Sequence, residues 1–320
     1  MSLRVRHNFI RRTLLALLTC IVALMCACSG TIPAVQGVQS VESMAAEAPD
    51  DLDALFEAKL PGPELPPDVK PDEPICTDYT SFGLLRICYQ NETDKKLKLQ
   101  VIHGEDGEDT IYYNLDGEGE NEDFSLQYGD GQYTARIMQN IEDNQYIAVE
   151  AKTFDVMMDD ATCAYLNSIQ NVNWNYEMQP IQDVRYIVAD SLSETGDTLQ
   201  LSTQDLYNYV VEHIRYDSDK VFNLLYDYLP DIVDTYTTNL GICYDYASLF
   251  AAMLRSIGIP AKLVKGYASY APDTYHAWNE VYLDGEWITV DPTRDATLRA
   301  SGLHYELQKE AADYTIVYEY

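Results

Sequence analysis

The sequence is poor in positive charge. It has 21 Lys and Arg residues against 52 Asp and Glu residues, which gives a formal net charge of -31 at pH 7. Nucleic acids and anionic membrane surfaces bind proteins through clusters of cations. The composition therefore argues against both as partners, and it suits a domain that works at a cell surface.

Metal-binding patterns are also missing. The seven cysteines and five histidines do not show the paired spacing of a zinc site. Acidic clusters occur at residues 105–109 and 116–123, but they do not follow the ligand spacing of an EF-hand loop. Solvated acidic turns are the better interpretation. We expect neither a metal nor a cofactor.

The apolar run at residues 14–27 is too short for an ordinary membrane span. Four arginines precede it, and Ala27-Cys28-Ser29-Gly30 follows. This order resembles a bacterial lipoprotein signal with its cleavage box. It predicts a signal peptide at residues 1–28 and a lipid on Cys28, which would anchor the chain to the outer face of a membrane. The alternative is a plain cleaved signal peptide.

Composition divides the rest of the chain into three parts. Residues 29–75 hold six prolines between positions 61 and 74 and predict an extended tether, with a short helix at 51–60. Residues 76–159 alternate in hydrophobicity between turns, which predicts a small β-sandwich. Residues 160–320 change to a helical period and predict a separate domain.

Two cysteines of the predicted β-sandwich leave their pairing open. Cys76 and Cys88 could form a disulfide across adjacent strands in an oxidising exterior, or could remain buried thiols. Spacing alone does not decide between these alternatives.

Cys243 begins a segment with the pattern of a buried helix. Apolar side chains recur at positions 250, 253, 254 and 257, and the run ends at Gly258 and Pro260. Cys243 is therefore expected at the helix N-terminus, where unpaired N–H groups and the helix dipole favour a thiolate. The thiolate is the nucleophilic form of cysteine. A lone Cys at such a position is more often a small buried hydrophobe.

Residues 276–291 predict a β-hairpin around the tight turn Asp284-Gly285. If Leu283 faces Glu286, then His276 and Asp291 are diagonal neighbours on one face, about 7–8 Å apart at the backbone. A carboxylate that holds an imidazole facing a thiol is the general Cys–His–Asp arrangement of nucleophilic catalysis. Further expected elements are a helix at 204–215 capped by Ser202 or Thr203 and strands at 261–269 and 314–320.

Three separated segments in this order resemble the transglutaminase-like superfamily. They are residues 241–247 around Cys243, 275–280 around His276 and 287–293 around Asp291, within a similar stretch from 214 to 295. The resemblance implies a papain-like α+β fold for residues 160–320 with a Cys–His–Asp triad. It implies acyl transfer at glutamine amides, amide hydrolysis, or in some members no activity. Residues 124–133 resemble accessory sandwich domains that precede such cores in bacterial surface proteins.

The resemblance also suggests further site residues. Family members use an upstream aromatic or amide group to help hold the oxyanion, and Tyr216 is the candidate here, although a packed tyrosine at a helix end is the alternative. Tyr244, Tyr275 and Trp278 are candidate walls of a substrate groove. A structural role in the core is the alternative for these aromatic residues.

The sequence thus predicts a cell-surface cysteine enzyme that acts on protein or peptide amides through a thioester on Cys243. A cysteine protease of the same fold and a binding module without turnover are the alternatives. The acyl acceptor, the substrate and the oligomeric state do not follow from the residues.

Overall fold

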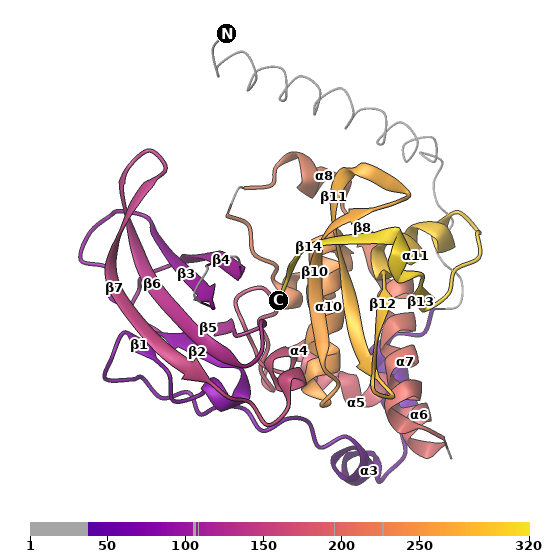
Figure 1. Cartoon of the computed structure of the whole chain (residues 1–320). Helices are drawn as coiled ribbons and strands as arrows, with labels where there is room; N and C mark the ends of the chain where they lie inside the picture. Colours follow the sequence, from indigo (N-terminus) through magenta and orange to yellow (C-terminus); the bar gives the residue numbers. More distant parts are fainter. Residues whose placement is uncertain (1–37, 105–106, 108, 195, 226) are drawn as a thin grey trace. The chain divides into compact units, whose positions relative to one another are not determined.

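The computed structural model describes residues 38–320 except 105, 106, 108, 195 and 226 (Figure 1). The predicted signal peptide and Cys28 lie outside the described residues. Residues Val41–Tyr320 form one compact unit. Within the described part of the chain, no helix is both long and apolar enough to cross a membrane.

Two antiparallel sheets form the first part of this unit. One sheet has the strand order β1-β2-β5 and the other has the order β4-β3-β6-β7. Alternate residues of β3 are buried, as the sequence pattern predicts for a strand with one covered face. The strands are β1 (Ile75–Cys76), β2 (Leu84–Ile87), β3 (Leu97–His103), β4 (Asp109–Leu115), β5 (Glu122–Ser125), β6 (Gly131–Glu142) and β7 (Gln145–Val156). The β-sandwich architecture and the domain boundaries stay predictions.

Cys76 and Cys88 are free thiols in the structure. Cys76 lies opposite Arg86 in the β1–β2 pair, whereas the backbone N–H of Cys88 bonds the carbonyl of Pro74. The two cysteines are on neighbouring segments but not opposite each other, and the Cys88 thiol donates to the Gly119 carbonyl at 3.2 Å.

Part of the predicted tether packs onto the domain instead of extending away from it. Helices α2 (Val41–Glu47) and α3 (Leu52–Lys59) contact α5 and α6, and they bury Leu52 and Leu60. The proline-rich stretch that follows is pinned as well, because Arg86 donates to the Pro67 carbonyl at 2.6 Å. Apolar side chains in the helices explain the difference, since their burial favours docking over an extended chain.

Four of the helices, α4, α7, α9 and α11, contact one long buried helix, α10 (Cys243–Ser256). The longest of them, α7 (Thr198–His213), begins earlier than the sequence pattern indicates. Asp197 caps it by accepting from the N–H groups of Leu199 and Gln200 at 3.0 and 3.3 Å. The remaining helices are α4 (Gln179–Gln182), α5 (Val184–Ile187), α6 (Ala189–Ser193), α8 (Ser218–Phe222), α9 (Ile232–Thr238) and α11 (Pro292–Ala300).

Helix α10 packs against a five-stranded sheet with the order β13-β12-β11-β10-β14 (Figure 1). The buried guanidinium of Arg255 ties the helix end to this sheet by donating to the Ala261 carbonyl at 2.9 Å. The strands are β10 (Ala261–Ala268), β11 (Ala271–Leu283), β12 (Glu286–Val290), β13 (Gln308–Lys309) and β14 (Tyr314–Glu319), and a short parallel pair joins β8 (Arg215–Tyr216) to β9 (Leu240–Gly241). The fold is α+β, as the sequence predicts.

Candidate active site

Cys243 is the first residue of α10, as its sequence context predicts. Every other residue of this helix is buried, whereas Cys243 is partly exposed. The backbone N–H of Ile242, just before the helix, is bound by the Asp245 carboxylate at 2.8 Å. The thiol therefore sits at a fixed helix N-terminus and at an accessible edge of the core, where the helix dipole favours a negative charge.

The hairpin has the register that the sequence predicts. Leu283 pairs with Glu286, and the pairing continues regularly to Asn279 and Val290. Its turn adopts positive φ at both central residues, Asp284 at 52° and Gly285 at 86°, which is the geometry of a tight two-residue hairpin.

His276 and Asp291 meet at the open end of this hairpin. The His276 Nε2 atom lies 2.9 Å from Asp291 Oδ2. Asp291 is fully buried and caps α11, because its Oδ1 atom accepts from the N–H of Arg294 at 3.0 Å. With Nε2 engaged by the carboxylate, Nδ1 is the ring nitrogen left to exchange a proton with a thiol.

Two tyrosines complete the environment of Asp291. The hydroxyls of Tyr270 and Tyr314 donate to Oδ2 at 2.8 and 3.0 Å, beside His276. The buried carboxylate thus has a full set of donors, which stabilise its ionised form. Sequence reasoning did not assign either tyrosine to Asp291; only the pairing of β14 with β10 brings Tyr314 here.

The electrostatics of this pair favour an imidazolium beside a carboxylate. Burial opposes the charge on His276, but Asp291 and the Cys243 thiol outweigh it and raise the pKa of His276 to about 10. Burial likewise opposes ionisation of Asp291, yet His276 and the hydrogen bonds of the site lower its pKa. Cys243 is among the groups that raise the pKa of His276, so the thiol and the imidazole are close enough to interact. The structure therefore brings all three predicted triad residues together.

Tyr216 lies close in space to the segment that precedes Cys243. In the parallel pair β8–β9 it is opposite Gly241, two residues before Cys243. Burial, followed by the charges of Cys243 and Asp245, raises the pKa of Tyr216. Its hydroxyl thus keeps its proton and remains a hydrogen-bond donor, and its role at an oxyanion stays a prediction.

Asp245 has a cationic partner that the sequence did not suggest. Its fully buried carboxylate accepts from the Lys220 ammonium at 2.9 Å and from the Tyr228 hydroxyl. A negative charge two residues after Cys243 would oppose the thiolate. Here Lys220 offsets that charge.

Trp278 is not a wall of a groove. It is fully buried in a small apolar cluster with Val264, Ala268 and Tyr314. Its ring stacks on His276 with centroids 6.2 Å apart, so it supports the imidazole from the core side. Trp278 thus takes the core position that the sequence left open as the alternative to a groove wall.

The two tyrosine candidates differ in exposure. Tyr275, next to His276, is 46% exposed and contacts the Tyr267 ring at a centroid distance of 5.6 Å. Tyr244 is buried, and its hydroxyl accepts from Asn171 at 2.6 Å. Its ring lies under Lys265, whose Nζ atom is 3.6 Å from the ring centroid.

Gly266 allows two strands and a tryptophan to approach closely. It pairs with His276 on β11 and with Ile316 on β14. A Cβ atom added at Gly266 would lie 2.0 Å from the Thr315 carbonyl oxygen and 2.9 Å from Trp278 Cη2. The position therefore accepts no side chain without a shift of β14 or of the tryptophan.

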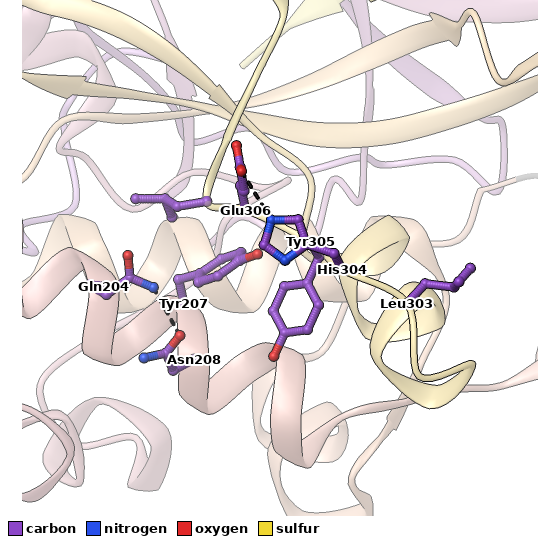
Figure 2. A pocket seen from close by; sticks show the side chains of 8 residues that line it. Gln204, Tyr207, Asn208, Leu303, His304, Tyr305 and Glu306 are labelled. Atoms are coloured by element: carbon purple, nitrogen blue, oxygen red, sulfur yellow. Dashed lines mark hydrogen bonds and ion pairs between the residues drawn. The ribbon is translucent and has the colours of Figure 1, made fainter.

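A surface pocket lies elsewhere, between α7 and the segment after α11 (Figure 2). None of the three triad residues lines it. Several polar side chains that line the pocket bind each other. Gln204 contacts Asn208 at 2.9 Å, and His304 contacts Glu306 at 3.0 Å. Among the described residues, no group of three or more His, Cys, Asp or Glu side chains is placed to hold a metal ion.

Residues 187–292 match the family model of the transglutaminase-like superfamily. Among curated proteins, the kyphoscoliosis peptidase of Mus musculus is 33% identical over 118 residues, which cover 33% of this chain and 17% of that protein. The uncharacterized protein YebA of Bacillus subtilis is 27% identical over 154 residues, covering 39% of this chain and 21% of that protein. The chain thus spans only a minor part of the length of these relatives.

Solved structures show weaker similarity. LapG of Legionella pneumophila is 17% identical with a TM-score of 0.31, and the match covers 43% of this chain and 81% of that chain. The transglutaminase of red sea bream is 13% identical with a TM-score of 0.31, covering 66% of this chain and 48% of that chain. With scores this low, the family model is the finding that identifies the core.

Proposed function

We propose, since the chain carries a transglutaminase-like core, that it is a cysteine acyl-transfer enzyme acting on protein or peptide amides. The observation that supports this most directly is the partly exposed Cys243 at the start of α10, close to a His276 that Asp291 holds at 2.9 Å. A helix N-terminus and an imidazolium each favour the thiolate that such chemistry needs.

The first half-reaction forms a thioester. The Cys243 thiolate adds to the amide carbonyl carbon, and the negative charge moves to the carbonyl oxygen. The backbone N–H at the start of α10 and the Tyr216 hydroxyl are the donors available to that oxygen. His276 then gives its proton to the departing nitrogen, the C–N bond breaks, and an amine leaves.

The second half-reaction returns the thiol. A primary amine or water attacks the thioester carbonyl while His276 takes its proton, and the C–S bond breaks to regenerate the thiolate. An amine acceptor gives a new amide, and water gives a carboxylic acid. Asp291 holds the imidazole and stabilises its charged form in both steps.

Labelling and turnover together test this proposal. Brief iodoacetamide treatment near pH 6.5 should modify Cys243 ahead of the other cysteines of the described chain. Cys163 is the matched control, because burial and the nearby Asp160 raise its pKa to about 11. Faster labelling of Cys76, Cys88 or Cys163 than of Cys243 would contradict the assignment of the nucleophile.

The reaction type is tested with a glutamine-containing protein and a labelled primary amine. We expect amine incorporation with the wild type and with Cys163→Ala, and none with Cys243→Ala. Cleavage fragments without incorporation would indicate a hydrolase instead, in line with the name of the mouse kyphoscoliosis peptidase. Neither product across varied substrates would leave the binding module as the function.

We further propose that the chain is attached to the outer face of a bacterial membrane through a lipid on Cys28, and that its substrate is a protein or peptide at that surface. The sequence Ala27-Cys28-Ser29-Gly30 after an apolar run supports this. Cys28→Ala should leave the membrane fraction or be poorly processed, whereas Cys20→Ala should behave like the wild type. A fully processed, membrane-bound Cys28→Ala protein would exclude this anchor.

A further inference from the structure

One lysine stands out beside the thiol. Lys265 is half-buried on β10, in a chain whose net charge is -31. Its ammonium lies 3.6 Å from the centroid of the Tyr244 ring and 5.1 Å from that of Tyr320. It forms no ion pair with any carboxylate in the part of the chain that the structure describes.

Lys262, on the same strand, is paired with carboxylates and serves as a comparison. Lys262 contacts Glu280 and Glu319 at 3.2 and 2.9 Å. Lys262 and Lys265 are three residues apart on a strand, so their side chains point to opposite faces of the sheet. Removing an ammonium from water costs free energy unless another group stabilises its charge. The ring faces of Tyr244 and Tyr320 stabilise the Lys265 charge only in part.

Strand pairing places Lys265 at the inner end of an exposed aromatic surface. Lys265 is opposite Tyr318 on β14, and Tyr267 is opposite Tyr275 on β11. Directly opposite residues share a face, so these four side chains lie on one side of the sheet. Tyr267, Tyr275 and Tyr318 are 41%, 46% and 44% exposed. We call these three residues the tyrosine platform.

Lys265 also lies near the start of α10, the helix that begins with Cys243. Tyr244, the ring under Lys265, is the residue after Cys243. Burial lowers the pKa of Lys265 to about 8, and the charge of Cys243 acts in the opposite direction. At neutral pH the lysine is still mostly charged.

We infer that Lys265 is a specificity-determining residue that binds a carboxylate of the acyl donor, a peptide with an acidic side chain next to the amide that Cys243 attacks. The inference rests on the proposed acyl-transfer function. The tyrosine platform would support the adjoining peptide, since ring faces bind apolar stems and backbone planes. A carboxylate on Lys265 supplies the ion-pair partner that the described residues of the chain lack.

Two alkylating reagents test this without a known substrate. Iodoacetate and iodoacetamide have the same leaving group and attack the same thiol, but only iodoacetate carries a carboxylate. The ratio of their rates at Cys243 therefore reports how well the site receives a carboxylate beside the sulfur. Lys265→Gln should lower that ratio about three- to tenfold relative to wild type, and Lys265→Arg should restore most of it. High salt should shrink the difference.

Lys262→Gln is the matched control, because it removes a lysine from the same strand on the opposite face. It should leave the ratio nearly unchanged. If Lys265→Gln slows both reagents equally, the lysine only supports the thiolate and the inference is wrong. An unchanged ratio with unchanged rates would overturn it as well.

A binding experiment separates this inference from the proposed function. Inactive Cys243→Ala protein is titrated calorimetrically with two acetylated tetrapeptides that differ only in a Glu or a Gln beside the central glutamine amide. We expect the Glu peptide to bind about three- to tenfold more tightly, and the preference to disappear in Cys243→Ala/Lys265→Gln. Equal binding of both peptides overturns the inference, whereas an inert Cys243 with this preference intact overturns only the enzyme proposal.

Discussion

Two helices begin beside the candidate site, and a fully buried carboxylate stands at the start of each. Asp245 in the first turn of α10 accepts from Lys220 and Tyr228, and Asp291 before α11 accepts from His276, Tyr270 and Tyr314. The two regions use the same parts, a carboxylate, a phenol and a cation. They differ in the cation, because an imidazole ring can bind the carboxylate through one nitrogen and exchange a proton through the other, whereas a lysine ammonium has a single nitrogen.

Because of this difference, one ion pair has a structural role and the other has a role in proton transfer. The Lys220–Asp245 pair joins α8 to the first turn of α10 and neutralises a charge near the thiol. The His276–Asp291 pair can also accept and release a proton at a fixed position. Substitutions in the two regions should therefore change different properties of the protein.

The largest expected effect is that of Asp291→Asn on thiol reactivity. The amide can still hold the imidazole ring, but it does not stabilise the imidazolium, so the thiolate loses its counter-ion. The rate of Cys243 alkylation by iodoacetamide near pH 6.5 should fall roughly 100-fold. Asp295→Asn is the control, since Asp295 is a buried carboxylate of the same helix that binds Tyr207 and Lys309. Equal losses in both variants would argue against a special role of Asp291.

The next effect is that of Lys220→Met on stability. This change leaves the buried Asp245 carboxylate without its cation, which should lower the free energy of unfolding by about 2 kcal/mol, less than for a fully buried pair because Lys220 is 21% exposed. Chemical denaturation measures it. Lys152→Met, which removes an exposed ion pair with Glu73, should leave stability nearly unchanged. A Lys220→Met protein as stable as Lys152→Met would show that this pair contributes little.

A pH profile distinguishes the histidine pair from the lysine pair. The pKa of His276 is about 10 in the folded protein, above its ordinary value near 6.5, so its stabilisation is complete below pH 6.5 and is lost as pH rises toward 10. Between pH 6.5 and 8 the free energy of unfolding should fall by up to about 2 kcal/mol more in wild type than in His276→Gln. Above pH 8 the lowered pKa of Lys265 acts with the opposite sign. Parallel profiles in the two proteins would contradict the raised pKa.

The smallest expected effect is that of Tyr314→Phe. It removes one hydroxyl donor from Asp291 but leaves His276, Tyr270 and the Arg294 N–H in place, so the free energy of unfolding should fall by about 1–2 kcal/mol. Tyr318→Phe, on the same strand but 44% exposed, is the control and should have no measurable effect. Thermal unfolding compares the two variants. An effect of equal size in both would show that the hydroxyl of Tyr314 is not needed by the carboxylate.

Local patterns were sufficient for the parts of the site that lie close together in the sequence. The tight turn at Asp284-Gly285 fixes the register of the hairpin, and the register fixes which residues come near His276. The position of α10 was predicted in the same way, from the apolar spacing within it and from Gly258 just after its end. These features depend on a few consecutive residues, which is why a single sequence predicts them.

Features that depend on distant segments were missed. Tyr314 reaches Asp291 only because β14 pairs with β10, and Lys220 reaches Asp245 from α8, 25 residues earlier in the chain. The sequence left Trp278 as either a groove wall or a core residue, and its burial depends on contacts with β10 and β14, which lie elsewhere in the sequence. Lys265 had only a weak signal, because it is one of two lysines in β10 and the sequence does not show which of them is paired.

Gly266 sets a limit on how this site can vary. The residue opposite His276 has no room for even a methyl group, because the Thr315 carbonyl and the Trp278 ring close the space from two sides. A chain that keeps this strand arrangement is therefore expected to keep glycine here, whatever its substrate. In a mutational library of the region, position 266 should tolerate fewer substitutions than its exposed neighbour Tyr267, so selection for new specificities has to work through the residues around it.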